Sequence, residues 1–172
     1  MKSRPIYLMG FMGCGKSTIG KSLAKKVGRK FVDLDNLIEK KVNKSISELF
    51  EQEGEDFFRK EETTLLTSTN FSNHVVALGG GTPCFNNNLK YIKQSGFSIY
   101  LKASEERLLG RLRQAKNKRP LIAKLTDEQL KIFIERQLGK REGFYTQADL
   151  IIETENFEWE ELLGDLRNQE LY

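Results

Sequence analysis

The segment Gly10–Ser17, with the sequence GFMGCGKS, carries the clearest chemical signal in the chain. It matches G-x-x-x-x-G-K-[ST], the phosphate-binding P-loop. In such a loop, successive backbone N–H groups point at one anion, and the start of the following helix adds positive potential. We expect Lys16 to reach the outer phosphates and the Ser17 hydroxyl to ligate Mg²⁺. The motif predicts a site for a nucleoside triphosphate, with a chance match as the alternative.

The neighbouring segments give the motif the context that it needs. The apolar run Ile6–Met9 predicts a buried strand before it, and Thr18–Val27 has the apolar spacing of a helix after it. Strand, glycine loop and helix follow one another in this order where the motif binds phosphate. The residues that we expect to contact the nucleotide are Gly13, Cys14, Gly15, Lys16, Ser17 and Thr18.

Two acidic residues, Asp33 and Asp35, stand at the end of a second predicted strand, Phe31–Leu34. Because side chains alternate along a strand, we expect both carboxylates on one side, near the phosphates. One acid can bind a magnesium-bound water or orient the nucleophile, while the other holds a substrate hydroxyl. The alternative for Asp35 is a cap on the next helix.

Arg59 and Glu62 lie three residues apart in a predicted helix, Glu55–Thr67, and therefore share one face of it. An acid beside Arg59 could hold the guanidinium for bidentate capture of a carboxylate. The spacing alone favours the other interpretation, a solvated helix face with an ordinary ion pair.

Three consecutive glycines, Gly79, Gly80 and Gly81, follow a predicted buried strand, Val75–Leu78. Glycine costs backbone entropy, so three in a row indicate that another group approaches the main chain closely. Their N–H groups could hold a carboxylate or hydroxyl of a ligand. A tight turn is the alternative, although one glycine would be enough for it.

The segment Arg107–Arg119 is dense in Lys and Arg and ends at Pro120, which marks a break from helix into loop. A basic loop that closes over phosphates would neutralise charge on the transferred group and exclude water. We therefore expect a lid over about 112–125. A solvated helix face is the alternative, and it suits Lys116 and Lys118 best.

Strand and helix patterns alternate along the chain. The strand candidates are Ile6–Met9, Phe31–Leu34, Val75–Leu78, Phe97–Leu101 and Leu150–Ile152. The helix candidates are Thr18–Val27, Asp35–Lys41, Ser45–Glu51, Glu55–Thr67, Asn87–Gln94, Glu105–Gln114, Thr126–Leu138 and Trp159–Asn168. This alternation predicts an α/β fold with a parallel sheet covered on both faces. Such sheets bind ligands at the carboxyl ends of their strands, where the P-loop, the acid pair and the three glycines all fall.

Length and composition bound the class of protein. The chain has 172 residues, which suits one domain, and a net charge of +4, which permits nucleic-acid binding in principle. Lys and Arg are interleaved with Asp and Glu, however, and no apolar run approaches the ~20 residues of a membrane span. The start of the chain enters the first strand at once, so we expect no signal peptide. We expect a cytoplasmic monomer with reduced Cys14 and Cys84 and with no nucleic-acid or membrane partner.

Taken together, these motifs resemble those of the shikimate kinase family over nearly the whole chain. The matching residues are Gly10 to Thr18, Asp33-Leu34-Asp35, Phe58-Arg59 with Glu62, Gly79-Gly80-Gly81, Arg119-Pro120-Leu121, and Arg141 followed by Tyr145. Many families share the P-loop, whereas the joint order of these motifs is much more specific. The resemblance implies transfer of phosphate from ATP, with Mg²⁺, to the 3-hydroxyl of shikimate in aromatic amino acid biosynthesis.

The resemblance also implies a fold. It is the nucleoside monophosphate kinase-like, three-layer α/β/α P-loop fold, with five parallel strands in the order 2-3-1-4-5. The whole chain, 1–172, would form a single shikimate kinase domain. Helices within about 33–62 would bind shikimate, and the lid would span about 112–125.

The resemblance implies roles for particular residues. Lys16, Asp33 and Arg119 would be catalytic, and Ser17 and, through a water, Asp33 would hold the metal. Asp35, Gly79, Gly80 and Gly81 would line the shikimate pocket, and Arg59 and Arg141 would hold the shikimate carboxylate. Arg119 would also reach the ATP phosphates, and of two candidates to stack on adenine, Arg111 and Arg113, we choose Arg113.

The chain departs from the family pattern in two places. Gly143 stands where the family commonly has proline, so we expect a loosened turn after Arg141. The segment 153–158 is acidic and lacks the basic residue that some members carry near adenine. We therefore expect the adenine contacts to come mostly from the backbone, with an arginine stacked on the base.

Two alternatives remain open. The first is a kinase for gluconate or for a nucleoside monophosphate on the same scaffold. The second is a basic P-loop domain that binds nucleic acid or senses ATP. Against the second, the chain lacks a basic platform interleaved with aromatic residues. It also lacks the Asn-Lys-x-Asp string of guanine-specific switches.

Overall fold

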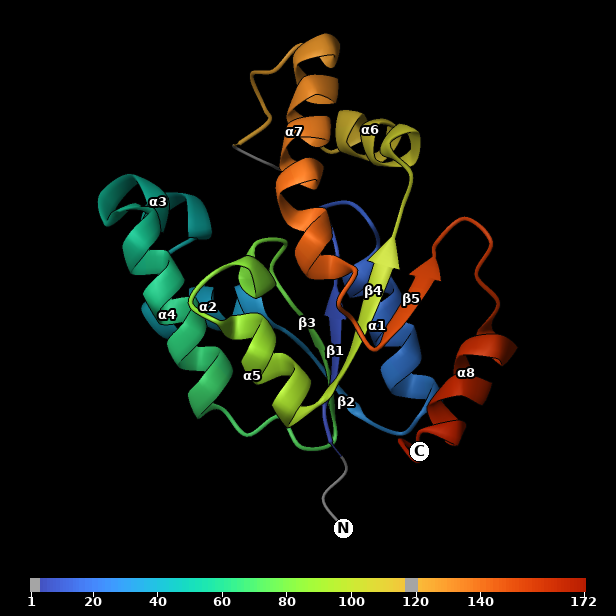
Figure 1. Ribbon diagram of the computed structural model, residues 1–172. Helices are drawn as coiled ribbons and strands as arrows, with labels where there is room; N and C mark the ends of the chain where they lie inside the picture. The colour runs from blue at the N-terminus through green and yellow to red at the C-terminus, as the bar shows by residue number, and fades with distance from the viewer. Residues whose placement is uncertain (1–3, 117–120) are drawn as a thin grey trace.

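The computed structural model describes residues 4–116 and 121–172. Its centre is one parallel sheet, formed by β1 (Ile6–Met9), β2 (Lys30–Asp33), β3 (His74–Ala77), β4 (Phe97–Lys102) and β5 (Leu150–Glu153). The strand order is β2-β3-β1-β4-β5, as predicted. In Figure 1 the strands point together toward the end of the sheet above which α6 and α7 lie.

Helices cover both faces of the sheet. The helices of the described residues are α1 (Lys16–Lys26), α2 (Leu34–Val42), α3 (Ile46–Gln52), α4 (Gly54–Ser68), α5 (Asn88–Ser95), α6 (Glu105–Gln114), α7 (Asp127–Tyr145) and α8 (Trp159–Asn168). A short 3₁₀ turn, η1 (Thr82–Cys84), follows β3. Helices α4 and α5 lie on one side of the sheet and α1 and α8 on the other, which is the predicted three-layer arrangement (Figure 1).

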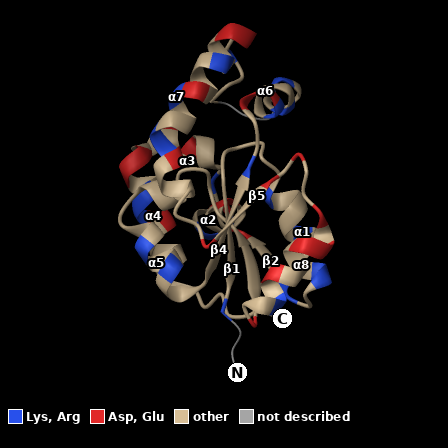
Figure 2. Ribbon diagram, turned by 45° about the vertical axis from the view of Figure 1, so that its right-hand side comes forward, with Lys and Arg blue, Asp and Glu red and all other residues tan. Residues whose placement is uncertain are grey.

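The central strands are apolar because both of their faces are covered. All four residues of β1 are buried, and so are the first five of β4. Strands buried on both faces are continuous apolar runs, without the alternation of a half-exposed strand. The edge strands β2 and β5 remain partly exposed. Figure 2 shows the charged residues mostly on the helices, with Lys and Arg interspersed among Asp and Glu.

Local sequence signals set the starts of several helices. The Ser45 side chain accepts a bond from the Glu48 N–H, and the Glu48 side chain closes a capping box at the start of α3. Thr126 and Gln129 form the same box at the start of α7. Among the described residues, no helix combines the length and the apolar character that crossing a bilayer requires.

Helix α7 is longer than the sequence predicted. The periodic pattern indicated an end at Leu138 and a turn near Gly143, but the helix continues to Tyr145. Glycine is a poor helix former, so Gly139 and Gly143 made the last two turns look like a loop. Burial of Tyr145, which has no exposed surface, stabilises these turns through tertiary packing. The expected turn at Gly143 is therefore wrong.

Replacing Gly143 with alanine is expected to stabilise the protein. No atom outside the helix backbone lies within 4 Å of a Cβ built at this position. Alanine loses less backbone entropy on folding, so the free energy of unfolding should rise by roughly 0.5–1 kcal/mol. Urea denaturation measures this change.

Gly20→Ala is the matched control in α1. There a Cβ would lie 2.5 Å from Phe31 Cε2, so the same substitution should destabilise the protein. A lower denaturation midpoint for Gly143→Ala than for the wild type would contradict the assignment of Gly143 to an unstrained, solvated helix position.

Candidate active site

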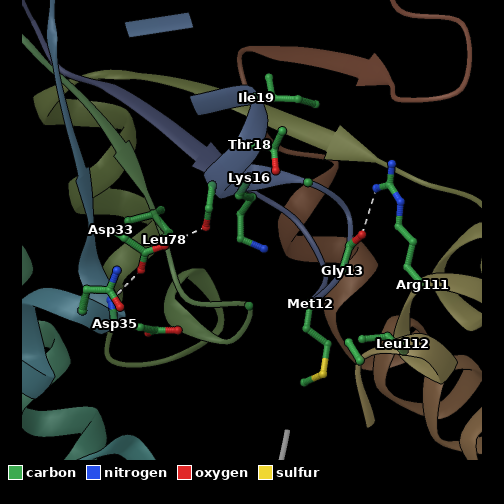
Figure 3. Close-up of a pocket in the computed structure, with 15 residues that line it drawn as sticks. Met12, Gly13, Lys16, Thr18, Ile19, Asp33, Asp35, Leu78, Arg111 and Leu112 are labelled. Atoms are coloured by element: carbon green, nitrogen blue, oxygen red, sulfur yellow. Dashed lines mark hydrogen bonds between the residues drawn. The ribbon is translucent and has the colours of Figure 1, made fainter. Parts of the chain in front are cut away.

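A cleft of about 590 Å³ lies at the carboxyl ends of the strands. Its lining comes from the P-loop and α1, from the start of α2, from the turn after β3 and from α6 (Figure 3). The lining residues are Met12, Gly13, Gly15, Lys16, Ser17, Thr18, Ile19, Asp33, Asp35, Asn36, Leu78, Gly80, Arg111, Leu112 and Ala115. Parallel α/β sheets place their ligands at this edge, so the cleft is the candidate active site.

The P-loop curls because its glycines adopt backbone angles that other residues avoid. Gly13 has φ 84° and Gly15 has φ 109°, and Gly15 caps the start of α1. Lys16 is the first residue of α1, and its Nζ donates to Gly10 O at 2.6 Å and to Phe11 O at 3.0 Å. The loop itself therefore holds the ammonium group at the mouth of the phosphate-binding turn. Cys14 is buried, as a small loop residue should be.

Ser17 and Asp33 meet in the cleft. Ser17 Oγ donates to Asp33 Oδ2 at 2.8 Å. The other carboxylate oxygen accepts the Asp35 N–H at 3.2 Å, so Asp33 caps α2. The residue that caps the helix is thus Asp33, not Asp35, and Leu34 already belongs to α2. Strand alternation was the wrong reason for pairing the two acids, because Asp33 ends a strand while Asp35 lies in the first turn of a helix.

The oxygens of Ser17 and Asp33 are of the type that Mg²⁺ prefers. Magnesium is usually held by one or two carboxylates together with substrate phosphates and water, not by a cage made only of protein groups. Within residues 4–116 and 121–172, no group of three or more His, Cys, Asp and Glu side chains could form such a cage. A hydroxyl and a carboxylate beside a phosphate-binding loop fit a magnesium–nucleotide complex.

Asp35 is an acid with an unusual environment. Burial, together with the negative charges of Asp33 and Glu62, raises its pKa to about 6, while Lys16 and Arg59 act in the opposite direction. A carboxylate with a pKa near neutrality can accept a proton at physiological pH. Asp35 also lies within electrostatic reach of both Lys16 and Arg59, which links the P-loop to the second half of the site.

Arg59 is buried, with 9% of its surface exposed. Its Nη1 donates to Glu62 Oε2 at 2.9 Å, and its Nε and Nη2 each lie 3.2 Å from Glu55 Oε1. The guanidinium lies over the rings of Phe58 and Phe85, at 5.0 and 4.2 Å from their centroids. The solvated helix face that the spacing favoured is therefore wrong. Phe85 follows η1 and approaches α4 only in the folded chain.

At each of the three glycines, the missing side chain leaves room for one charged side chain to lie close to the backbone. A Cβ on Gly79 would lie 2.8 Å from Asp35 Oδ1, and one on Gly81 would lie 2.5 Å from Arg59 Nη2. A Cβ on Gly80 would lie 3.3 Å from Arg141 Nη1. The close approach that the triple glycine predicted is present, and the approaching groups are side chains of the protein. A simple tight turn would not need three glycines.

Arg141 reaches the glycine turn from α7. Its guanidinium lies 5.7 Å from the centre of the Phe11 ring, and one turn further on Tyr145 donates its hydroxyl to Gly80 O. The helix runs without interruption through Gly143, so the direction of Arg141 is set by regular helix geometry. Burial raises the pKa of Tyr145, which keeps this hydroxyl protonated as a donor.

Arg111, and not Arg113, contacts the P-loop. Arg111 Nη1 donates to Gly13 O at 2.9 Å, whereas Arg113 Nε pairs with Asp127 at 2.8 Å and does not line the cleft. Arg119 lies outside the described residues, as does the centre of the lid expected over 112–125.

The acidic segment 153–158 has a structural contact that the sequence did not reveal. Glu155 Oε1 accepts bonds from Ser104 N at 2.8 Å and from Ser104 Oγ at 2.9 Å. Ser104 is the N-cap of α6, so Glu155 anchors the helix that carries Arg111. Cleft residues such as Met12 and Leu112 were also missed, because apolar side chains in or near a motif carry no chemical signal of their own.

The fold and the cleft define the class of this protein. A P-loop at the edge of a 2-3-1-4-5 parallel sheet, facing a pocket with acidic and arginine side chains, is the architecture of a small-molecule kinase of the nucleoside monophosphate kinase-like type. A sequence model described as shikimate kinase matches residues 12–168. The chain belongs to the shikimate kinase family.

Individual relatives support the assignment. The chain is 45% identical over 166 residues to a shikimate kinase of Flavobacterium johnsoniae, covering 94% of this chain and 95% of the relative. It is 39% identical over 164 residues to one of Parabacteroides distasonis, covering 95% of each. Among solved structures, shikimate kinase from Bacteroides thetaiotaomicron superposes with a TM-score of 0.87 at 39% identity, covering 98% and 97% of the two chains. The Acinetobacter baumannii enzyme in complex with shikimate gives 0.84 at 36% identity, covering 99% and 96%.

Proposed function

We propose that this protein transfers the γ-phosphoryl group of ATP to the 3-hydroxyl of shikimate, giving ADP and 3-phosphoshikimate for aromatic amino acid biosynthesis. Family membership supports the reaction. The observation that carries the proposal for this chain is that Asp35 lines the cleft together with Lys16 and is also close enough to Arg59 to be affected by its charge. Asp35 lies within electrostatic reach of Lys16 on the P-loop and of Arg59 on α4.

Shikimate offers a carboxylate and several hydroxyls, and the proposed acceptor site has groups for both. Arg59 and Arg141 approach the glycine turn from α4 and α7 and would bind the carboxylate through charge-assisted hydrogen bonds. Asp35 would accept hydrogen bonds from the hydroxyls, and Gly79, Gly80 and Gly81 would line the pocket. In this proposal helices within about 33–62 form the acceptor-binding part of one domain.

ATP would bind along the P-loop. Backbone N–H groups from Gly13 to Thr18 would hold its phosphates, and Lys16 would contact the outer ones. Arg111 replaces Arg113 as the residue proposed to stack on adenine, because Arg111 contacts Gly13 while Arg113 pairs with Asp127. Arg119 keeps the role that the sequence suggested, that of a lid residue within about 112–125 that reaches the phosphates.

Catalysis in this proposal depends on position and charge. Asp35 accepts the proton of the attacking hydroxyl, and Lys16 and Arg119 balance the charge on the transferred group. Ser17 and, through water, Asp33 would hold Mg²⁺. When bound, the ion would supply positive charge to the phosphate oxygens. The protein's contribution is to hold both substrates in line in a cleft closed to water.

The proposal treats the enzyme as a cytoplasmic monomer without nucleic-acid or membrane partners. It is supported by the fact that residues of one chain fill every proposed role. It is also supported by the interspersed charges of the helices in Figure 2, which form no evident continuous basic stripe in that view. Light scattering after gel filtration tests the oligomeric state.

A coupled assay of ADP release tests the reaction. With ATP and Mg²⁺, shikimate should stimulate release, while gluconate, AMP and CMP should not, because gluconate lacks the ring and a nucleotide carries phosphate in place of the carboxylate. Phosphorus NMR of the product identifies the hydroxyl that is phosphorylated. Faster turnover with gluconate or a nucleotide would contradict the proposal. Salt-sensitive binding of an oligonucleotide without kinase activity would favour the nucleic-acid alternative.

The raised pKa of Asp35 predicts a pH dependence of activity. The value of kcat/KM for shikimate should rise with pH and level off above an apparent pKa near 6, because only the ionised carboxylate accepts the proton. Asp35→Asn should lose this activity at every pH. A pH–rate profile from pH 5 to 8 measures both effects.

The same shift predicts the opposite dependence for stability. Between about pH 4 and pH 6 the folded protein holds the Asp35 proton more tightly than the unfolded chain does, so the stability due to this residue falls as pH rises. The full loss is about 3 kcal/mol for a shift of this size. Asp35→Asn should therefore be more stable than the wild type at pH 7.5 and similar to it near pH 4. Asp56→Asn, an exposed change on α4, is the control, and equal stabilisation by both variants would contradict the prediction.

A further inference from the structure

The hydroxyl of Thr82 is buried and has no role in the function proposed above. Thr82 begins η1 directly after the three glycines, and none of its surface is exposed. Its Oγ1 donates to Glu62 Oε1 at 2.5 Å, and Glu62 is also fully buried. A carboxylate oxygen without access to water must accept hydrogen bonds from protein donors. The bond from Thr82 therefore stabilises the Glu62 carboxylate in its position.

The second oxygen of Glu62 holds the arginine of the acceptor site. Glu62 Oε2 accepts a bond from Arg59 Nη1 at 2.9 Å. The other acid beside Arg59, Glu55, is half-exposed, and ion pairs in contact with solvent are weak. The buried bond to Glu62 is therefore the one that fixes the guanidinium. With one oxygen bound to Thr82 and the other to Arg59, the Glu62 carboxylate cannot rotate without losing a bond.

Thr82 is itself fixed to the glycine turn. Its N–H donates to Gly79 O at 3.1 Å, and its carbonyl accepts a bond from Asn88 Nδ2 at 2.9 Å. As a β-branched residue, threonine has few side-chain rotamers, so a fixed backbone also fixes its hydroxyl. A continuous set of bonds thus joins the glycine turn to Thr82, Glu62 and Arg59.

We propose that Thr82 is a positioning residue for the acceptor: its hydroxyl orients the Glu62 carboxylate, which holds the Arg59 guanidinium beside Gly81 where the shikimate carboxylate binds. The proposal rests on the role of Arg59 under the proposed function. It assigns Thr82 an effect on acceptor affinity and none on the P-loop.

Thr82→Val tests the proposal, because valine keeps the shape of threonine and removes the hydroxyl. The KM for shikimate should rise about tenfold, since a hydrogen bond to a buried charged group is lost, while kcat changes by less than about twofold and the KM for ATP is unchanged. Thr82→Ser should restore a KM within about twofold of the wild type. Thr64→Val is the control, because it removes an exposed hydroxyl from the same helix as Arg59.

A purely structural role gives different results. If Thr82 only fills space, Thr82→Val should have the wild-type KM for shikimate and Thr82→Ala a higher one. The proposal instead predicts that both variants raise this KM by a similar factor. In a Glu62→Gln background, Thr82→Val should raise the KM for shikimate by less than about a further twofold, because both changes act on the same hydrogen-bond network. An unchanged KM for shikimate in Thr82→Val, or no rescue by Thr82→Ser, would overturn the proposal.

Arg59→Lys separates the failure of this proposal from the failure of the proposed function. If Arg59→Lys also leaves the KM for shikimate unchanged, the proposed role of Arg59 is wrong. If Arg59→Lys raises this KM and Thr82→Val does not, only the role of Thr82 is wrong.

Discussion

Lys16→Ala should lower kcat by about 10³-fold or more, because it removes the ammonium group that we propose balances charge on the transferred phosphoryl group. The structure holds Lys16 Nζ at the P-loop through Gly10 O and Phe11 O. The backbone N–H groups of the loop remain, and ATP should still bind with reduced affinity. Single-turnover kinetics measures the chemical step, and calorimetry measures nucleotide binding.

Lys21→Ala is the matched control for this variant. Lys21 is exposed on the same helix, α1, and lies outside the cleft. Its replacement should leave kcat and both KM values unchanged, and both variants should melt near the wild-type temperature. A Lys16→Ala enzyme that kept more than about a tenth of the wild-type kcat would contradict the catalytic role of the lysine.

Arg59→Lys should raise the KM for shikimate by about 100-fold and change kcat much less. Lysine keeps a positive charge beside Glu62 but cannot bind a carboxylate with two parallel hydrogen bonds. Lysine is preferred to alanine here because alanine would leave the Glu62 carboxylate buried without a cation, which costs about 3–5 kcal/mol of stability. Steady-state kinetics with each substrate varied in turn measures the effect.

Arg136→Lys provides the comparison for the same exchange at an exposed position on α7. It should alter neither KM. The KM for ATP should also stay constant in Arg59→Lys, since Arg59 does not line the cleft beside the P-loop. Equal rises in both KM values would indicate a general loss of structure and would remove the support for a specific acceptor contact.

Short-range patterns were enough for most of the secondary structure and for the P-loop. Apolar runs located every strand to within about a residue, and the helix candidate Ser45–Glu51 lies within a residue of α3 at both ends. The P-loop could be read directly, because the residues of its motif are consecutive in the chain. These signals depend on neighbours within one or two helical turns, and such neighbours are visible in a linear sequence.

The proposed acceptor half of the site depends on contacts between distant segments. Spacing alone favoured a solvated Arg59, because nothing local shows that Phe85 covers it. Arg113 is paired with Asp127 and does not line the cleft, which could not be known before the position of Asp127 was known. The last turns of α7 form because Tyr145 is buried, and this burial is not visible in the sequence.

Electrostatics is non-local for the same reason. The pKa of Asp35 reflects burial, the charge of its neighbour Asp33, and the charges of Glu62, Lys16 and Arg59, which come from two other parts of the chain. Composition and periodicity identify which residues can carry charge. Burial and distance set how strongly those charges act on one another, and both arise only when the sheet and its helices pack together.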